Sequence, residues 1–424
     1  MKRTLTPLLA VVLTLSLAAC AEKKPELTAE ALTPALDTQQ TATLEIAGFM
    51  GNFEAPDQVI NAFSDYYPNV TFTYDHNSAY MLSEYLTNNK NTDLFMTCDQ
   101  NLRQPDPPEY FVPDRCLDLS DAGLDLSALS PEAVAACTVD GKLLRLPIAM
   151  NAYGVVVNKT LLKKEGLSVP TNCEEFLSVL AALKDKGYTP LQGSAQHLYG
   201  DLTVSMGMDP LLRDSTLLAA LYAWEDAAAA AVLPAFERLE ALIAAGYTDY
   251  ALNCTYPTDN YDGSIMAFFE GDVPFYVCNA ECVSGMKKRE SKSEIFHAAP
   301  FEYEFLYAPL GDSGAYAYLE SWYGFSVSKD SDEAELAVEF LRFMATRLDE
   351  MAGIKGLPSV AADSADERYA GIRHTDAAEL SFTNDGRITE TVRNAFQQVC
   401  GDLSAGVCAT AGEAARAFVQ QCAG

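Results

Sequence analysis

The chain has 424 residues, of which 49% are hydrophobic and 10% aromatic, so it can fill the cores of two domains. Its 29 basic and 59 acidic residues give a formal net charge of -30. This balance argues against nucleic acid and anionic lipid as binding partners, because both require clustered lysine and arginine. We interpret the acidic excess as a solvated surface that keeps an exported protein soluble.

The first twenty residues have the pattern of a secretory signal. Two basic residues and an apolar stretch over 8–17 precede two alanines and Cys20, and the stretch is too short for a permanent membrane span. The residues "LAAC" (17–20) resemble a bacterial lipobox, which implies cleavage of a signal peptide over 1–19 and lipid attachment to the Cys20 thiol. The alternative is an ordinary signal peptide with an incidental cysteine.

Residues 20–42 carry no sustained apolar period and predict a flexible tether. Twenty-odd flexible residues reach on the order of 25 Å, enough to lift a globular body off a membrane. Acyl chains on Cys20 would then hold the protein at a membrane without a transmembrane helix.

The remaining cysteines predict neither a metal site nor a redox cofactor. An even number of cysteines in an exported chain permits disulfides, but their pairing cannot be read from the sequence. Cys278 and Cys282 do not have C-x-x-C spacing, and the four histidines are scattered singly, so we expect no metal and no cofactor. The ten cysteines after Cys20 stand at 98, 116, 137, 173, 254, 278, 282, 400, 408 and 422.

Strands and helices alternate through the first hundred residues of the mature chain. The apolar patterns predict strands over 43–47, 70–76 and 93–99, with helices over 56–67 and 80–87 between them. This alternation is typical of parallel α/β architecture.

The middle of the chain continues with longer helices. Residues 141–167 predict a strand, a proline-marked corner, a second strand and a short helix. Thr171 and Glu174 form a capping box for the next helix. Residues 215–245 predict two helical pieces divided at Pro234.

Two further α/β passages follow. The first is a helix over 263–271 followed by a strand over 273–279. The second lies within 322–346 and predicts a strand and then an amphipathic helix, with Ser331 as its N-cap.

Taken together, four stretches resemble the extracellular solute-binding protein family 1 of ABC importers, to which maltose-binding protein belongs. They are "DGKLLRLPIAMNAYGVVVNKTLLKKEGL" (140–167), "PTNCEEFLSVLAALKDKGYTPL" (170–191), "MAFFEGDVPFYVCNA" (266–280) and "YGFSVSKDSDEAELAVEFLRFMAT" (323–346). Each is a strand or helix of loose consensus, and their order along the chain is more specific than any one of them.

The resemblance implies a type II, two-lobe periplasmic-binding-protein-like α/β fold with discontinuous lobes. The lobes would be joined by hinge strands that cross near 147–153 and 309–323, with ligand bound in the cleft between them. The amino-terminal lobe would combine 43–149 with 312–350, and the other lobe 150–311 with 351–424.

Ligands in α/β sheets meet the loops beyond the carboxyl ends of the strands. For a sugar, aromatic faces would cover apolar C–H patches while carboxylates and amides would bond to hydroxyls. Trp322 stands just before a predicted strand at a hinge crossing, and Trp224 stands in a predicted helix. Either tryptophan could instead be packed as ordinary core, and the carboxylates could be helix caps or solvated groups. The predicted ligand contacts are Phe49, Asn52, Asp99, Tyr153, Trp224, Asn279, Glu320, Trp322 and Tyr323.

Three other functions compete with a sugar receptor. A lipid-anchored glycosidase needs a carboxylate pair, but 59 acidic residues make such pairs uninformative, and the sequence has no G-x-S-x-G, H-E-x-x-H, Walker A or G-x-G-x-x-G motif. An adhesin would not need paired lobes. A binder of a cationic solute such as a polyamine would tolerate the negative charge.

We therefore expect a receptor of an ABC importer, with carbohydrate as its ligand, no enzymatic activity and no catalytic residues. Its other partners would be the transmembrane subunits of the permease and, through the lipid, the outer face of the cell membrane. We expect a monomer that binds no nucleic acid.

Overall fold

The computed structural model describes most of the chain after residue 31. The predicted leader and Cys20 lie outside the described residues, as do the first part of the tether and most of the helix predicted over 80–87. The described residues are 32–48, 54–75, 85–86, 88–89, 91–98, 113–127, 129–195, 198–256, 261–348, 350–351, 381–384 and 387–422.

Three parallel strands open the fold, and they confirm the three strands predicted for this part of the sequence. β1 (Ala42–Gly48) pairs with β2 (Val70–Asp75) on one side and with β3 (Leu94–Cys98) on the other. α1 (Glu54–Ser64) connects β1 to β2. We call the part of the molecule built on these strands the N-terminal lobe.

A helix from much later in the chain completes this lobe. α14 (Ala334–Ala345) packs beside α1, and the ring of Phe63 lies 5.2 Å from that of Phe340 and 5.6 Å from that of Phe343. These aromatic side chains are fully buried. The apolar stripe predicted within 322–346 is therefore confirmed, and it faces the N-terminal core.

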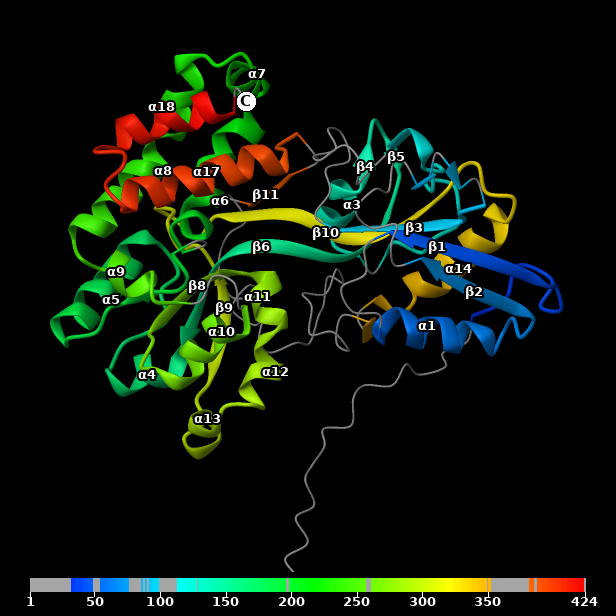
Figure 1. The fold of residues 1–424 in the computed structure, drawn as a ribbon, viewed down its shortest axis with the longest axis horizontal. Coiled ribbons are helices and arrows are strands. Elements are labelled where there is room, and N and C mark those ends of the chain that lie inside the picture. Colours follow the sequence, from blue (N-terminus) through cyan, green and yellow to red (C-terminus); the bar gives the residue numbers. More distant parts are fainter. Residues whose placement is uncertain are drawn as a thin grey trace, which may run out of the picture.

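Two long antiparallel strands run through the middle of the molecule and are shared by both halves (Figure 1). β6 (Leu146–Asn158) pairs with β10 (Ala317–Val327) as far as Ala152, and from Tyr153 onward it pairs with two other strands. All 13 residues of β6 are buried. The corner expected at a proline is wrong, because Pro147 is the second residue of β6 and its fixed φ suits extended backbone.

The second half of β6 belongs to the C-terminal lobe. In the described part of the chain one nine-stranded sheet runs in the order β2-β1-β3-β10-β6-β8-β7, with β11 beside β10 and β9 beside β6. A separate hairpin joins β4 to β5. The bounds of these strands are β4 (Thr138–Val139), β5 (Lys142–Leu143), β7 (Leu191–Gln192), β8 (Phe275–Asn279), β9 (Tyr303–Tyr307) and β11 (Ser381–Asn384).

Helices cover both faces of the C-terminal part of the sheet (Figure 1). One face is covered by α5, α6, α8, α17 and α18, and the other by α10 to α13. The bounds are η2 (Pro113–Arg115), α3 (Pro131–Ala136), α4 (Lys159–Lys164), α5 (Cys173–Asp185), α6 (Leu198–Arg213), α7 (Ser215–Tyr222), α8 (Asp226–Ala244), α9 (Tyr250–Asn253), α10 (Tyr261–Glu270), α11 (Ala280–Ser284), α12 (Met286–Glu290), α13 (Glu294–Ala298), α17 (Glu390–Ser404) and α18 (Ala411–Gln421).

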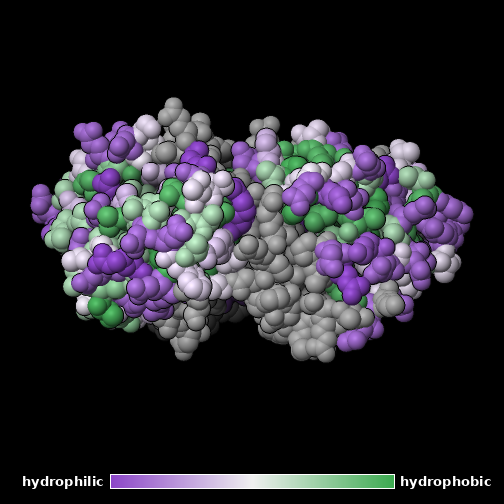
Figure 2. Space-filling model, turned by 90° about the horizontal axis from the view of Figure 1, so that it is seen from above, coloured by the Kyte–Doolittle hydropathy of each residue, from purple (hydrophilic) through white to green (hydrophobic). Residues whose placement is uncertain are grey.

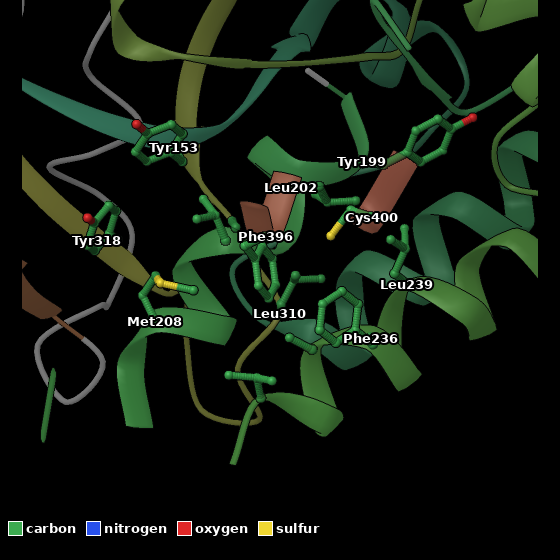
Figure 3. Close-up of a cluster of buried hydrophobic side chains, with 14 of the residues drawn as sticks. Tyr153, Tyr199, Leu202, Met208, Phe236, Leu239, Leu310, Tyr318, Phe396 and Cys400 are labelled. Atoms are coloured by element: carbon green, nitrogen blue, oxygen red, sulfur yellow. The ribbon is translucent and has the colours of Figure 1, made fainter. Parts of the chain in front are cut away.

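The apolar cores show where the boundary between the lobes lies along β6 and β10. The N-terminal core includes Met150 of β6 and Phe325 of β10, whereas the largest C-terminal core includes Tyr153 and Tyr318 of the same strands. Figure 3 shows Tyr153 and Tyr318 near one another at the edge of that core, with Phe396 of α17 farther inside. The molecule is therefore a two-lobe α/β protein, and Figure 2 shows polar side chains over much of the visible surface of both bodies.

The helical region over 215–245 breaks at a different place from the one predicted. α7 ends at Tyr222 and α8 begins at Asp226, while Pro234 lies inside α8. The break falls at Trp224, whose φ of 61° is left-handed and incompatible with a continuing helix. The proline signal was wrong because tertiary packing carries α8 through Pro234: the neighbouring Ala235 and Phe236 are buried in the C-terminal core.

Two predicted caps are displaced. The side chain that caps α5 is Asn172, which accepts a hydrogen bond from the Glu175 amide at 3.0 Å, one residue beyond the predicted box. Ser331 does not cap α14 directly, because its hydroxyl accepts from the Glu333 amide and donates to buried Asp93. Asx and serine side chains have several local backbone amides within reach, so a one-residue shift is not visible in the sequence.

None of the helices in the described ranges combines the length and hydropathy needed to cross a bilayer. The nine cysteines whose side chains are described are free thiols, and most of them are buried.

The close contact of β6 with β9 makes Gly154 hard to replace. A Cβ at this position would lie 2.0 Å from the carbonyl oxygen of Leu306, a backbone atom that cannot move without disturbing the sheet. We predict that Gly154→Ala lowers the free energy of unfolding by about 2 kcal/mol or more, measured by urea unfolding. Gly401→Ala is the control, because a Cβ there, in the last turn of α17, meets no atom within 4 Å, and it should stabilise by up to about 1 kcal/mol. Equal effects of the two substitutions would contradict the assignment.

Candidate ligand site at the crossing of the lobes

The carboxyl end of β8 brings a polar turn to the middle of β6. Asn279 is the last residue of β8 and lies opposite Tyr153 of β6. Its side chain caps α11 by accepting a hydrogen bond from the Cys282 amide at 2.9 Å. Asn151 of β6 is buried and accepts a hydrogen bond of 3.3 Å from the Glu281 amide. Two asparagines thus hold the start of α11 against the shared strands.

A buried carboxylate marks the same level of β10. Glu320 is 4% exposed and lies opposite Asn151 in the β10–β6 register. Its Oε1 accepts hydrogen bonds from the Tyr153 hydroxyl at 2.7 Å and from Nη1 of Arg393 at 2.6 Å. Its Oε2 accepts a hydrogen bond from the Tyr318 hydroxyl at 3.0 Å. The carboxylate therefore joins β6, β10 and α17.

The charge of Arg393 keeps Glu320 ionised. Burial alone would raise the pKa of Glu320, but the Arg393 charge and the hydrogen bonds from two tyrosines and from Arg393 overcome it and hold the pKa below its ordinary value. Arg393 is itself buried and comes from α17, about seventy residues further along the chain. We call Glu320, Arg393, Tyr153 and Tyr318 the crossing cluster.

A second carboxylate lies beside the crossing cluster and behaves differently. Asp201 of α6 is 1% exposed and accepts a hydrogen bond of 2.6 Å from the Gln397 amide. Burial raises the pKa of Asp201 to about 7, although Arg393 and the Gln397 hydrogen bond oppose the rise. The charge of Arg393 thus lowers the pKa of both Glu320 and Asp201, and its direct hydrogen bond goes to Glu320.

The sequence predicted that Trp322 stands just before a strand, and this prediction was wrong. Trp322 lies inside β10. It is partly buried and sits where the β10–β6 register shifts, between Ser321 and Tyr323. The backbone of Tyr323 pairs with β3 on one side and β6 on the other, and its side chain lies outside the described part of the structure. The long apolar and aromatic run before Trp322 hid the true start of β10, because a strand buried on both faces has no alternation to mark its end.

The predicted contacts divide into three groups. Tyr153, Asn279, Glu320, Trp322 and the backbone of Tyr323 come together at the crossing of β6 and β10 or at the adjacent end of β8. Trp224 lies in the turn between α7 and α8 with 59% of its surface exposed, and it is not part of this group. The predicted contacts Phe49, Asn52 and Asp99 lie outside the described residues.

Four residues of the site were missed by sequence reasoning. Asn151 had a usable signal, because a single amide inside an otherwise apolar strand needs a partner when buried. Asp201 and Tyr318 lie in ordinary helix and strand patterns, and Arg393 belongs to a helix that the sequence analysis did not place. Only the tertiary structure brings α17 to the hinge strand.

The described groups at the crossing are amides, phenols, an indole and a carboxylate. The phenols and the carboxylate are buried and hydrogen-bonded to one another, and the charge of Arg393 is matched by Glu320. An anion would find no free charge in this arginine. Among the described residues no group of three His, Cys, Asp or Glu side chains could hold a metal ion.

Comparison with known proteins identifies the family. The sequence matches the family model of bacterial extracellular solute-binding proteins over residues 50–347, and the chain belongs to this family. The family resemblance found in the sequence is thereby confirmed. No curated protein sequence matches the chain.

Solved structures share the two-lobe fold at low sequence identity. RafE of Streptococcus pneumoniae, in its apo form, has a TM-score of 0.70 and 16% identity, over 91% of this chain and 98% of that chain. The putative binding protein MsmE of Bacillus subtilis, in an open conformation, has a TM-score of 0.70 and 15% identity, over 91% and 97% of the two chains. A sugar transporter from Bacillus licheniformis, in complex with stachyose, has a TM-score of 0.60 and 17% identity, over 89% and 98%. At these identities the likeness shows the fold.

The raised pKa of Asp201 predicts a pH-dependent stability. An acid whose pKa rises on folding, here from 3.8 to about 7, stabilises the folded state most at low pH, and this contribution is lost as the pH rises through that window. The substitution Asp201→Asn mimics the protonated acid and removes the dependence. We predict that it raises the free energy of unfolding at pH 8 by on the order of 1 to 3 kcal/mol and changes it little at pH 4, measured by urea unfolding.

Asp125→Asn provides the control for this experiment. Asp125 is exposed, and hydrogen bonds from Ser127 lower its pKa, so its substitution should give no gain at pH 8. A stability difference for Asp201→Asn that is the same at both pH values would contradict the prediction.

Proposed function

We propose that this chain is the substrate-binding lipoprotein of an ABC importer and that it captures a sugar or oligosaccharide between its lobes. The observation that carries the proposal is the crossing of β6 and β10, the strands that join the two lobes, where the crossing cluster, the amides of Asn151 and Asn279 and the aromatic residue Trp322 occupy neighbouring strand positions. An indole face suits the C–H surface of a pyranose, and the polar groups suit its hydroxyls.

The solved structures that share the fold support carbohydrate as the ligand class. One of them is described in complex with stachyose, another in complex with raffinose and a third in complex with acarbose. A further one is described as a chitin oligosaccharide binding protein. A cationic solute is less favoured by the site, because the buried carboxylate Glu320 is neutralised by Arg393.

The remaining sequence predictions complete the proposal. A signal peptide over 1–19 is removed, Cys20 carries the lipid, and residues up to 42 tether the protein to the outer face of the cell membrane. The monomer delivers its ligand to the transmembrane subunits of the permease and has no enzymatic activity. The lobes comprise 43–149 with 312–350 and 150–311 with 351–424. Most residues of the two apolar cores follow this division, but Tyr318 packs in the C-terminal core and Met150 and Met351 pack in the N-terminal core.

The proposed ligand contacts keep the residues predicted from the sequence and add one found in the structure. Trp322, Tyr153, Glu320 and Asn279 are the central set, and Asn151 joins them through α11. Phe49, Asn52, Asp99 and Tyr323 are proposed from their positions after strands or in β10. Trp224 is an outlying candidate.

A thermal-shift screen tests the ligand class directly. We expect raffinose, stachyose or a chitin oligosaccharide to raise the Tm of the protein in proportion to the logarithm of its concentration, by about 3 °C or more at a hundredfold excess over Kd. The sugar should be recovered unchanged by chromatography. Released monosaccharide would instead indicate a glycosidase, and a shift with spermidine alone would overturn the choice of carbohydrate.

The two tryptophans allow a matched comparison of the site. We predict that Trp322→Ala weakens binding of the sugar found in the screen by about tenfold or more, because an aromatic stacking surface is lost at the lobe crossing. Trp224→Ala removes the same side chain from an exposed turn. Isothermal titration of both variants decides between the two positions, and unchanged affinity of the Trp322 variant would refute its role.

A further inference from the structure

The stretch of chain that leads into β1 lies against the N-terminal lobe. The sequence assigns residues 20–42 to a tether, and the structure describes this stretch from Leu32 onward. From residue 32 to residue 42 every even-numbered residue is half-buried and every odd-numbered residue is exposed. An extended segment shows this alternation when one of its sides faces a surface. We call residues 32–41 the strap.

Apolar side chains of the strap contact the core of this lobe. Leu32 and Leu36 both pack against the N-terminal core, which includes Phe63 of α1 and Phe343 of α14. Burial of these leucine side chains favours the docked strap over one surrounded by water. The strap is therefore held by the same apolar surface that holds α14.

A buried carboxylate holds the backbone of the strap. Glu339 of α14 is 2% exposed, and its Oε1 accepts hydrogen bonds from the Ala35 amide at 2.9 Å and from the Tyr67 hydroxyl at 2.7 Å. Its Oε2 accepts a hydrogen bond from Arg342. The Leu36 amide donates to the Tyr67 hydroxyl oxygen at 3.4 Å. Burial and the hydrogen bond to Glu339 raise the pKa of Tyr67 to about 12, so the phenol keeps the proton that it donates.

The end of the strap next to β1 is held separately. The side-chain amide of Asn69, just before β2, donates a hydrogen bond of 3.1 Å to the Gln39 carbonyl. Asp37 closes a turn here, because its carboxylate accepts from the Gln39 amide at 2.9 Å and its carbonyl accepts from the Gln40 amide at 3.2 Å. Both ends of the strap are thus attached to the N-terminal lobe.

The docked strap limits how far the chain can reach from the lobe. The 12 peptide units from Cys20 to Leu32 can span at most about 40 Å, whereas the 22 units from Cys20 to Ala42 could span about 75 Å. This bound follows from the covalent dimensions of the chain alone. Docking therefore reduces the greatest possible distance between the lobe and a group on Cys20 to about half.

We propose that the strap is an attachment device for the membrane tether: it fixes the point where the tether leaves the protein beside α14 of the N-terminal lobe, and it leaves only residues 21–31 to span the distance to the membrane. All the strap contacts described above go to this lobe. The N-terminal lobe is then the one kept close to the membrane. The inference rests on the proposed function only for the lipid on Cys20.

Two sets of substitutions within the strap separate docking from composition. The double substitution Leu32→Ser and Leu36→Ser removes the half-buried side chains and changes no side chain of the lobe itself, so the lobe keeps its core. We call this the released variant. The control is Thr33→Ser with Ala35→Ser, which changes two exposed positions of the same strap and keeps the Ala35 amide.

Hydrogen exchange tests the docking without any membrane. The amides of Ala35 and Leu36 should exchange about tenfold or more slowly in the wild type and in the control than in an unstructured peptide, measured by mass spectrometry. In the released variant this protection should be lost. Exchange of the wild-type strap at the rate of an unstructured peptide overturns the inference, and so does equal protection in the wild type and the released variant.

The reach of the tether is measured on the acylated protein in phosphatidylcholine vesicles. A donor fluorophore is placed at Asp65, an exposed residue directly after α1, through a non-natural amino acid, and acceptor dyes are carried by the lipid headgroups. Freeing the strap makes the root-mean-square reach of the tether about a third greater, so the released variant should show less energy transfer than the wild type and the control.

Equal energy transfer in all three proteins overturns the limit on reach. Mass spectrometry of the mature amino terminus keeps this result separate from the proposed function. If Cys20 carries no acyl chain, the lipoprotein part of the proposed function fails, and hydrogen exchange at Ala35 and Leu36 still decides whether the strap is docked.

Discussion

The structure depends on two strands that serve both lobes at once. β6 is buried along its whole length, and β10 runs beside it from one apolar core into the other. A strand in this position cannot turn a polar side chain to solvent, so each buried polar group must find a partner inside the protein. Asn151 and Glu320 satisfy this requirement through the start of α11 and through Arg393. The polar groups of the candidate site are thus consequences of the way the lobes are joined.

The balance of charge at the crossing explains why the two buried carboxyl groups differ. Glu320 has the arginine in direct contact and two phenols as further donors, and these outweigh the cost of its burial. Asp201 accepts a hydrogen bond from the side-chain amide of Gln397, and the charge of Arg393 acts on it without a direct hydrogen bond. The effect of burial is therefore larger than these two effects, and the pKa of Asp201 rises. Breaking a buried ion pair costs more than never having formed it, because the remaining charge has no water to solvate it. The ion pair of the crossing cluster therefore holds α17 against β10.

Local patterns predicted much of the fold. The first three strands, α1, α14 and the strand that ends at Asn279 all follow from apolar periodicity, because each buries apolar side chains within one lobe. Predictions failed where packing outweighed a local signal: α8 continues through Pro234, the chain breaks instead at Trp224, and Pro147 lies within a strand. Of the site, Tyr153, Asn279, Glu320 and Trp322 could be named from strand ends and aromatic composition. Arg393 and Asp201 could not, since nothing in α17 or α6 distinguishes a residue that will face a hinge strand.

By itself, the sequence determined the α/β class, the family and the order of elements, because these rest on periodicity and on the succession of motifs along the chain. Only the tertiary structure decided which distant segments meet at the crossing of the lobes. The contact between Glu320 and Arg393 spans 73 residues, and no local propensity encodes a contact of that separation. It arises because α17 must bury its apolar face in the C-terminal core, and that packing carries Arg393 to the one buried carboxylate on β10.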